Sequence, residues 1–429
     1  MLRINLIIGN QPMQWLAATL ISAALLMSTA LSGQELGLKE AVAIASELDP
    51  GVQSLESRAQ AFDENAIADR QWPDPMVKVG ISNLPTRSFR FAQEPMTQAQ
   101  IGFQQVIPRG RSLSVKSART EAMAEQERAM QSDRAASVTL NVRRAWLNLY
   151  YWHGARRIVS SERQAMGGLV DSIESSYAAG RQKWQDLVSA ELELSLIDDR
   201  LIDADRQIDL GRGELAKWVG NETANRKLPQ DFPRLMQPSP KQRLADELNK
   251  HPRILSADAA IAIGERNVNL AEENYKPQWR VDFTYGFRKG DDPFGRNRED
   301  FGSLMLMFDV PLFTRNKQDR RLSARKYEAS SARFNRTDVL RELLRLLETE
   351  FANWERLGER ERLYQEVVLE RAGLNLEAAQ SAYQNNIVPF AGLIRAQLSE
   401  YRSQMSLLRV RINRSKAQSV LLYLMGDAP

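Results

Sequence analysis

The sequence predicts a mainly α-helical protein that also carries a small set of β-strands and is built as an internal tandem duplication. Three observations support this fold class: a helix-turn-helix segment that occurs twice, apolar residues at heptad spacing, and four runs in which apolar and polar residues alternate. The segment SYAAGRQKWQDLVSAEL at 176–192 is similar to AYQNNIVPFAGLIRAQL at 382–398, an offset of 382 − 176 = 206 residues. Self-similarity of this kind is the sequence signature of a repeated architecture.

The duplication extends over nearly all of the chain that follows residue 32. LDPGVQS at 48–54 is similar to KHPRILS at 250–256, and Pro108 in VIPRG matches Pro311 in DVPLF. We therefore expect a first repeat at 33–235 and a second at 236–429. Each repeat is expected to contain a helix (53–70 and 253–273), then a strand pair (76–107 and 278–310), then a long helical hairpin (112–219 and 316–426).

Residues 1–32 are expected to form a secretory signal peptide. Arg3 precedes an apolar run from Trp15 to Leu31, and Ala30-Leu31-Ser32 offers small residues for cleavage. An uncleaved membrane anchor is the alternative, but the run contains Ser and Thr and is short for a spanning helix. Because no later segment is apolar enough for such a helix, we expect an exported chain that could enter a membrane only as β-structure.

Composition restricts the possible functions. The chain has 429 residues, of which 43% are hydrophobic and 26% charged, so it could bury a sizeable core. Its net charge is only +4 and its basic residues are spread along the chain, so we expect no nucleic-acid partner. Because the chain has no cysteine and two histidines, His153 and His251, we expect no thiol catalysis and no transition-metal site. The acidic pair Asp198-Asp199 would point apart on a helix, and Asp291-Asp292 lies in a polar loop, so we expect no enzymatic activity and no cofactor. Met305 and Met307 are expected to fill one face of a strand.

Apolar residues at heptad spacing predict long coiled-coil helices. The two series in the first half are Leu187, Leu194, Leu201, Ile208 and Leu215, and Ala190, Ile197, Ala204, Gly211 and Trp218. The Gly167-Gly168 pair is the only strong breaker between Ser112 and Ala178, so about 67 residues would form roughly 100 Å of helix. An ordinary bundle core shows the same stripe, but helices of globular proteins are far shorter.

Alternation of apolar and polar residues predicts four strands with one apolar face. The residues of that face are Val77, Val79 and Ile81, then Ala99, Ile101, Phe103 and Ile107, then Trp279, Val281, Phe283, Tyr285 and Phe287, then Leu304, Leu306, Phe308 and Val310. This pattern is typical of outer-membrane barrels, although a half-buried sheet of a water-soluble protein also shows it. The long polar hairpin tips PTRSFRFAQEPMT and GDDPFGRNRED favour the membrane interpretation.

Four strands cannot close a barrel, and an open sheet edge in lipid would leave backbone groups unpaired. The chain is therefore expected to oligomerise. Two copies would give eight strands filled by side chains, whereas three copies would give twelve strands and could leave an aqueous lumen.

The order of these features resembles the TolC family of outer-membrane efflux proteins. The resemblance covers the duplicated plan of strand pair and long helical hairpin, the LDP entry at 48–50 and the two repeated turns. DPMVKVGISNLP and EPMTQAQIGFQQVIPRGRS are most similar to the branch that serves heavy-metal resistance-nodulation-division (RND) pumps.

The resemblance implies a homotrimer with a twelve-stranded barrel in outer-membrane lipid and a periplasmic tunnel of helical hairpins. It implies a passive outlet that works with a periplasmic adaptor (membrane fusion) protein and an inner-membrane RND-type pump. Without cysteine the chain would have no acyl anchor, so the barrel would be its attachment to the outer membrane. Two alternatives are a type I protein-secretion outlet of the same fold and a soluble periplasmic coiled-coil scaffold or adaptor.

The resemblance also implies that the two hairpin turns form the aperture and the adaptor contact. The candidate residues there are Tyr177, Gly180, Asp186, Tyr383, Asn386, Pro389 and Arg395. Gly180 and Asn386 tolerate a left-handed backbone. We hypothesise that Asp186 and Tyr383 form a hydrogen bond across neighbouring hairpins and hold the aperture shut. The favoured alternative is that Asp186 is a solvated carboxylate at a helix start.

The second turn departs from the family pattern. Well-known members place two acidic residues where this chain has Gly392 and Arg395, so an acidic ring is not expected. Arg395 could present positive charge to the pore or pair with an acid such as Glu400, and pairing is the favoured interpretation. Pro389 has no counterpart in the first turn and should stiffen the second.

Overall fold

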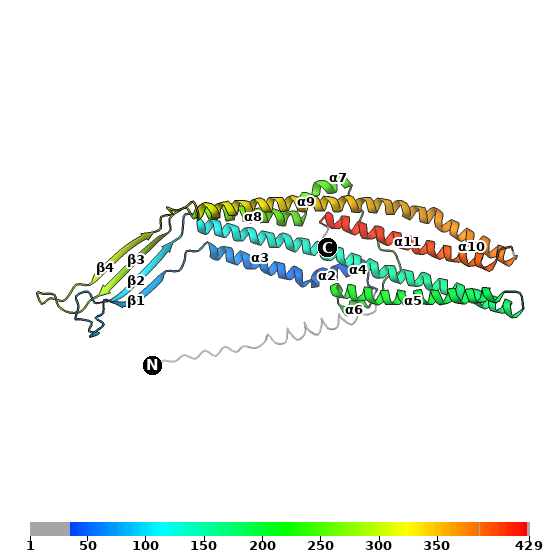
Figure 1. The fold of residues 1–429 in the computed structure, drawn as a ribbon, viewed down its shortest axis with the longest axis horizontal. Helices are drawn as coiled ribbons and strands as arrows, with labels where there is room; N and C mark the ends of the chain where they lie inside the picture. Colours follow the sequence, from blue (N-terminus) through cyan, green and yellow to red (C-terminus); the bar gives the residue numbers. More distant parts are fainter. Residues whose placement is uncertain (1–34, 386, 427–429) are drawn as a thin grey trace, which may run out of the picture. The chain divides into compact units, whose positions relative to one another are not determined.

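The computed structural model describes residues 35–385 and 387–426 (Figure 1). Its helices are α2 (Leu38–Leu48), α3 (Pro50–Asp69), α4 (Ser112–Ala178), α5 (Trp184–Val219), α6 (Asn221–Ala224), α7 (Lys241–Glu247), α8 (Pro252–Glu273), α9 (Gln318–Leu363), α10 (Leu369–Gln384) and α11 (Phe390–Leu424). Its strands are β1 (Met76–Ser82), β2 (Gln98–Ile107), β3 (Trp279–Phe287) and β4 (Phe301–Phe308). A 3₁₀ turn at Leu248–Lys250 precedes α8, and a π-helical turn at Tyr364–Val368 joins α9 to α10. The expected signal peptide lies outside the described residues.

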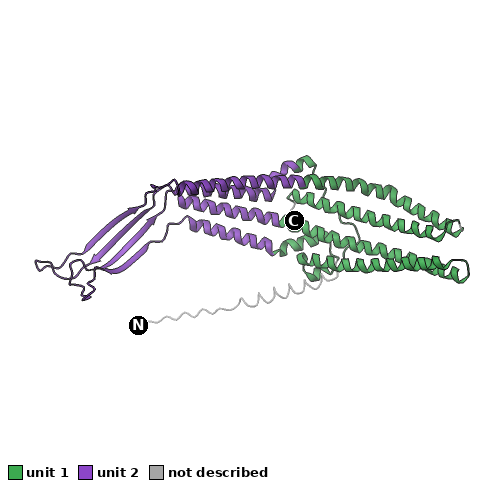
Figure 2. Ribbon diagram, viewed as in Figure 1, with its two compact units in different colours: residues 1–49, 135–244, 346–429 green, residues 50–134, 245–345 purple. Residues whose placement is uncertain are grey.

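The chain divides into two compact units (Figure 2). Unit 1 comprises Ala135–Leu244, the described residues from Leu346 onward and those before Pro50. Unit 2 comprises Pro50–Arg134 and Ala245–Arg345. Each unit therefore takes segments from both sequence repeats, and α4 and α9 each contribute residues to both units.

Unit 2 contains a four-stranded sheet in the order β1-β2-β3-β4, and every neighbouring pair is antiparallel. The register places Val77 opposite Phe103, Phe103 opposite Phe283, and Phe283 opposite Leu304. Because side chains alternate between faces along a strand, this register puts the predicted apolar residues of all four strands on one face. Among the residues that the structure describes, β1 and β4 each have a single strand neighbour.

Ion pairs hold the helices of unit 2 together. Thr120 Oγ1 of α4 donates to Asp69 Oδ2 of α3 at 2.7 Å, and Lys116 Nζ lies 2.7 Å from Asp69 Oδ1. Burial raises the pKa of Asp69, but these hydrogen bonds outweigh it and hold that pKa below its ordinary value. Arg333 of α9 pairs with Glu265 of α8 at 2.8 Å. Polar contacts of this kind join α3 to α4 and α8 to α9, and α8 also packs closely on α9 where Gly264 lies against the buried Ala329.

Unit 1 is organised around Trp146 on α4, which is fully buried. Its indole Nε1 donates to the carbonyl oxygen of Leu36 at 2.9 Å, and its ring stacks on Tyr150 at 5.2 Å between centroids. Tyr150 Oη donates to the Gln230 carbonyl at 2.7 Å. On α5 the close approach to α4 occurs at Gly211, where an added Cβ would lie 3.3 Å from a Leu149 methyl group. An aromatic and aliphatic core, in which the Trp146 indole N–H and the Tyr150 hydroxyl both have partners, therefore stabilises this unit.

The predicted fold class agrees with these elements. The helix expected from Ser112 to Ala178 is continuous as α4, and the four strands lie where alternation placed them. Helices α2, α6 and α7 and the π-helical turn were not predicted. In the part of the chain that the structure describes, no helix combines the length and the apolar character that crossing a membrane requires.

Candidate functional site

The first candidate turn joins α4 to α5 and is closed by Gly180. Gly180 has φ +70°, a left-handed conformation that glycine adopts without a Cβ penalty. Its N–H donates to the Tyr177 carbonyl at 2.8 Å, and the Arg181 N–H donates to the Ser176 carbonyl at 2.9 Å. These two bonds form a Schellman motif, which satisfies the last carbonyl groups of α4 and reverses the chain.

Aromatic side chains flank this turn. Tyr177 and Trp184 lie 5.5 Å apart between ring centroids, and both are exposed. Asp186 is half-buried in the first turn of α5, where a carboxylate interacts favourably with the helix macrodipole. The exposed aromatic pair gives the turn an apolar outer surface beside an acidic group.

The second candidate turn joins α10 to α11. Asn386 lies outside the described residues. Pro389 is exposed and caps α11 with an extended backbone, φ −69° and ψ 160°, while the next residue, Phe390, is buried. The Phe390 ring lies 5.9 Å from the Tyr383 ring. Pro389 thus fixes the direction of entry into α11, and Phe390 anchors the turn.

The two turns meet in a small apolar cluster and through one hydrogen bond. The buried members of the cluster are Ile173, Leu187, Ala190 and Phe390. Gln182 Nε2 donates to Tyr383 Oη at 3.0 Å. Burial raises the pKa of Tyr383, the charge of Asp186 raises it further, and the hydrogen bond from Gln182 opposes the shift. The negative charge of Asp186 therefore acts on the Tyr383 hydroxyl group. Within the described chain, that hydroxyl accepts its hydrogen bond from Gln182.

Sequence reasoning did not single out Gln182. It lies between Gly180 and the start of α5, and nothing in its residue type distinguishes it in the sequence from Gln185, three positions later in α5. Arg395, on α11, is exposed and forms no ion pair with any residue that the structure describes. Glu400 instead accepts a hydrogen bond from Gln404 at 3.2 Å.

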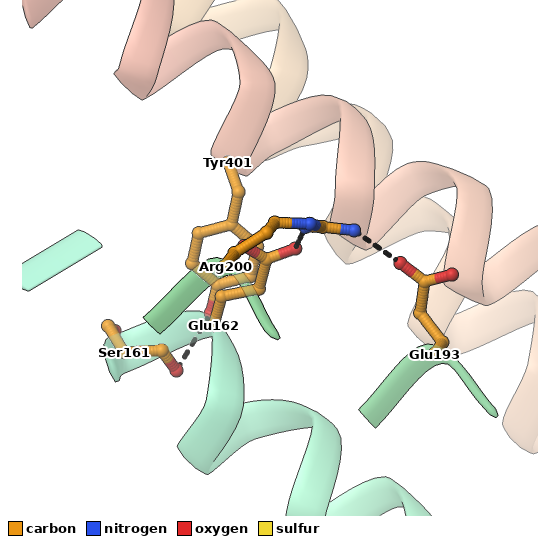
Figure 3. Close-up of polar contacts among 5 residues, drawn as sticks. All are labelled: Ser161, Glu162, Glu193, Arg200 and Tyr401. Atoms are coloured by element: carbon orange, nitrogen blue, oxygen red, sulfur yellow. Dashed lines mark hydrogen bonds and ion pairs between the residues drawn. The ribbon is translucent and has the colours of Figure 1, made fainter. Parts of the chain in front are cut away.

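A second polar cluster lies along the hairpins, where α4, α5 and α11 meet (Figure 3). Arg200 of α5 donates to Glu162 Oε1 of α4 at 2.9 Å and to Glu193 Oε1 at 2.8 Å. Tyr401 of α11 donates to the Ser161 carbonyl at 3.2 Å, which ties the two hairpins together. The cluster borders a cavity of about 520 Å³.

Glu162 is the unusual member of this cluster because it is only 3% exposed. Burial raises its pKa above the ordinary glutamate value, and the positive charge of Arg200 opposes that shift. Sequence analysis missed Glu162 because a charged residue beside a heptad stripe is normally solvated. Here Arg200 covers it, and removal of Arg200 would leave a buried charge without compensation.

The sheet of unit 2 supplies the remaining functional surface. Its apolar face is exposed on every strand: Val79 is 82%, Ile101 57%, Phe283 50% and Leu304 69% accessible. The opposite face is largely polar, with an ion pair between Lys78 and Asp282 and a hydrogen bond from Thr284 Oγ1 to Asp282 Oδ1 at 3.0 Å. On β4 this face carries Phe301, Met305 and Met307. Within the described ranges, no group of three or more His, Cys, Asp or Glu side chains is placed to hold a metal ion.

Comparisons with known proteins identify the fold. No protein-family model matches the chain, and no curated protein sequence matches it. The outer membrane protein VceC from Vibrio cholerae is 16% identical with TM-score 0.76, and the match covers 91% of this chain and 97% of VceC. CusC is 15% identical with TM-score 0.76, covering 91% of this chain and 94% of CusC.

The MtrE outer membrane channel of Neisseria gonorrhoeae, solved in its open state, is 14% identical with TM-score 0.72, covering 91% of this chain and 89% of MtrE. The predicted combination of long helical hairpins with four strands is therefore confirmed, and the trimeric twelve-stranded barrel stays a prediction. The described chain has the fold of outer-membrane channels, over nearly their whole length.

Proposed function

We propose that the chain is the outer-membrane outlet of a tripartite efflux system and conducts substrates passively across the periplasm and the outer membrane. The observation that carries this proposal is the sheet of unit 2. One exposed face is apolar on all four strands, and the other face is largely polar, with Met305 and Met307 of β4 among its residues. The fold shared with outer-membrane channels supports it.

An apolar sheet face of this extent is costly in water. Each square ångström of apolar surface covered contributes about 25 cal/mol, so lipid contact along four strands would stabilise the sheet strongly. The open edges at β1 and β4 also require partners, because lipid offers backbone groups no hydrogen bonds. Three copies would pair all edges in a ring of twelve strands, with the polar faces lining the lumen.

The same surface argues against the soluble scaffold that the sequence left open. In a water-soluble scaffold, Phe283 and Leu304 would lie exposed to water on the same face of adjacent strands, which is unfavourable. Exposed apolar patches of this kind mark membrane or protein contacts.

The turn residues serve as the aperture and adaptor contact in this proposal. Three copies would bring six hairpin turns into a ring. The apolar cluster under Phe390 and the bond from Gln182 to Tyr383 would fix the relative position of the two turns of one chain. Asp186, beside Tyr383, would then face a neighbouring hairpin.

The proposed partners are a periplasmic adaptor and an inner-membrane RND-type pump of the heavy-metal branch. The support for this branch is the sequence similarity of 74–85 and 94–112, and substrate selection would reside in the pump. Loss of the chain should raise susceptibility to soft metal ions more than to organic drugs. If susceptibility to organic drugs rises more than susceptibility to metal ions, the heavy-metal branch is the wrong assignment. If cells without the chain instead stop secreting a protein, the type I secretion outlet is favoured.

The first test is the native mass of the detergent-extracted membrane protein, followed by conductance in planar lipid bilayers. Three chains per particle and discrete conductance steps are expected. A monomer that fractionates without detergent would overturn the proposal.

The aperture hypothesis has its own test. Asp186→Asn and Tyr383→Phe should raise the open probability of the channel, and Arg371→Gln, an exposed substitution on α10, serves as control. Unchanged conductance in both variants would refute the latch while leaving the outlet function intact.

A further inference from the structure

Two adjoining cavities in unit 1 form a basic site that the outlet function does not use. The first, of about 470 Å³, lies among α4, α9 and α11, and the second, of about 360 Å³, lies among α4, α5 and α11. Arg144 of α4 and Lys416 of α11 line both cavities. These two residues therefore form the shared centre of the site.

The lining carries an excess of positive charge. Its basic members are Arg144, Lys217, Arg356, Arg360 and Lys416, and its acidic members are Glu214 and Glu350. Five positive and two negative groups leave a net charge of 5 − 2 = +3. Among the described residues, no carboxylate forms an ion pair with Arg144, Arg360 or Lys416.

Two of the basic side chains in the lining have partners of their own. Arg356 pairs with Glu359 at 2.9 Å, and Lys217 Nζ lies 4.7 Å from the centroid of the Trp218 ring. The positive charge that lacks an acidic partner among the described residues is therefore concentrated on Arg144, Arg360 and Lys416.

Lys416 is the least accessible of these unpaired cations. Its Nζ lies 3.4 Å from Asn148 Oδ1, a neutral acceptor at the limit of a hydrogen bond. Burial lowers the pKa of Lys416, the charge of Arg144 lowers it further, and Glu214 opposes the shift. A half-buried ammonium beside a guanidinium is unfavourable unless an anion offsets both charges.

We propose that this site binds a small, multiply charged oxyanion of the phosphate class. The planar guanidinium groups of Arg144 and Arg360 match the oxygens of a phosphoryl group, and Lys416 adds a point charge from α11. The cavity is large enough for such a group together with water. The site lies within one chain and does not depend on the outlet function.

Binding is coupled to protonation. The charged groups around Lys416 are Arg144 on α4, Glu214 and Lys217 on α5, and Glu350, Arg356 and Arg360 on α9. An anion holds Lys416 in its charged form, so binding takes up protons where free Lys416 is partly neutral. Affinity falls as pH rises through the lowered pKa of Lys416, at a lower pH than for an ordinary lysine.

The test is calorimetric titration of the detergent-purified full-length protein with inorganic phosphate, with chloride at equal ionic strength as the competitor baseline. Lys416→Gln and Arg144→Gln should each raise the dissociation constant about tenfold, since each removes a charged hydrogen-bond donor. Arg371→Gln, an exposed cation on α10 away from the cavities, should leave it within about twofold.

Two outcomes would overturn the proposal: phosphate binding no stronger than chloride binding, or Lys416→Gln and Arg144→Gln variants that bind as the Arg371→Gln control does. If circular dichroism shows that Lys416→Gln or Arg144→Gln fails to fold, the exposed substitution Arg360→Gln decides instead. Titration in buffers of different ionisation enthalpy then checks the proton uptake, which the Lys416→Gln variant should lose.

Discussion

The two compact units place similar apolar side chains in opposite environments. In unit 1, Trp146 and its neighbours are buried against one another inside a single chain. In unit 2, Phe283 and Leu304 lie opposite each other in the sheet and both are exposed. Unit 1 therefore carries its own core, whereas the sheet of unit 2 depends on whatever surrounds it. Accessibility within one chain thus separates apolar surface that folding covers from apolar surface that folding leaves exposed.

The strongest way to break this comparison is to remove the core of unit 1. Trp146→Ala should lower the free energy of unfolding by about 3–5 kcal/mol, because it leaves a cavity and an unpaired Leu36 carbonyl. Denaturant unfolding followed by far-UV circular dichroism measures the loss. Trp72→Ala in unit 2, where the side chain is exposed, is the control and should change stability by less than about 0.5 kcal/mol. Equal losses would show that exposure does not separate the units.

A pair of adjacent substitutions on β4 sharpens the comparison. Leu304 is on the apolar face and Ser303 on the polar face, and both are exposed in the chain. If lipid covers the apolar face, Leu304→Arg should cost about 2–4 kcal/mol, while Ser303→Arg should cost much less. Refolding into lipid vesicles at graded denaturant concentrations measures both. Equal losses of stability in the two variants would show that both faces of the sheet are exposed to water.

Glycine substitutions test whether the first turn of unit 1 requires a left-handed backbone at Gly180. Gly180→Ala should destabilise the protein by about 1–2 kcal/mol, because alanine disfavours the left-handed conformation. Gly168→Ala, within α4 and with open space around its Cβ position, should stabilise by about 0.5–1 kcal/mol. Thermal unfolding of the two variants gives opposite shifts if the turn geometry is correct.

The smallest expected effect is a change in pH dependence at Glu162. Because its pKa is raised in the folded state, the folded protein binds the proton more tightly than the unfolded chain does. The contribution of Glu162 to stability therefore decreases as pH rises from the ordinary value of 4.5 to the raised pKa. Glu162→Gln should remove this decrease, as stability measured across that window would show. Glu174→Gln, an exposed substitution on the same helix, is the matched control.

Regular periodicity made much of the fold predictable. Alternation along β3 and β4 follows from the two-residue repeat of a strand, so the apolar face was readable from the sequence. The heptads of α5 predicted buried positions such as Ile197 and Leu215, although Leu194 and Leu201 are only partly buried. Helix α2 was missed because its apolar positions span only 11 residues. Their burial depends on the cluster that they form with Trp146, which the local sequence does not show.

The candidate site was less predictable because it depends on contacts between distant segments. Gly180 could be recognised because few residues adopt its backbone conformation. The bond from Gln182 to Tyr383 joins residues 201 positions apart, and no local pattern encodes it. The burial of Glu162 likewise depends on where Arg200 lies.

The π-helical turn at Tyr364–Val368 has a consequence for how this part of unit 1 could have arisen. A π-helical turn holds one residue more than an α-helical turn, so deletion of a single residue would restore a regular helix. Because the wider turn takes up the extra residue, the helix after it keeps its rotational phase. Leu376 therefore lies against Leu393 and Ala396, with which it packs. The π-helical turn thus absorbs a difference of one residue in length without turning the packed face of α10 away from α11.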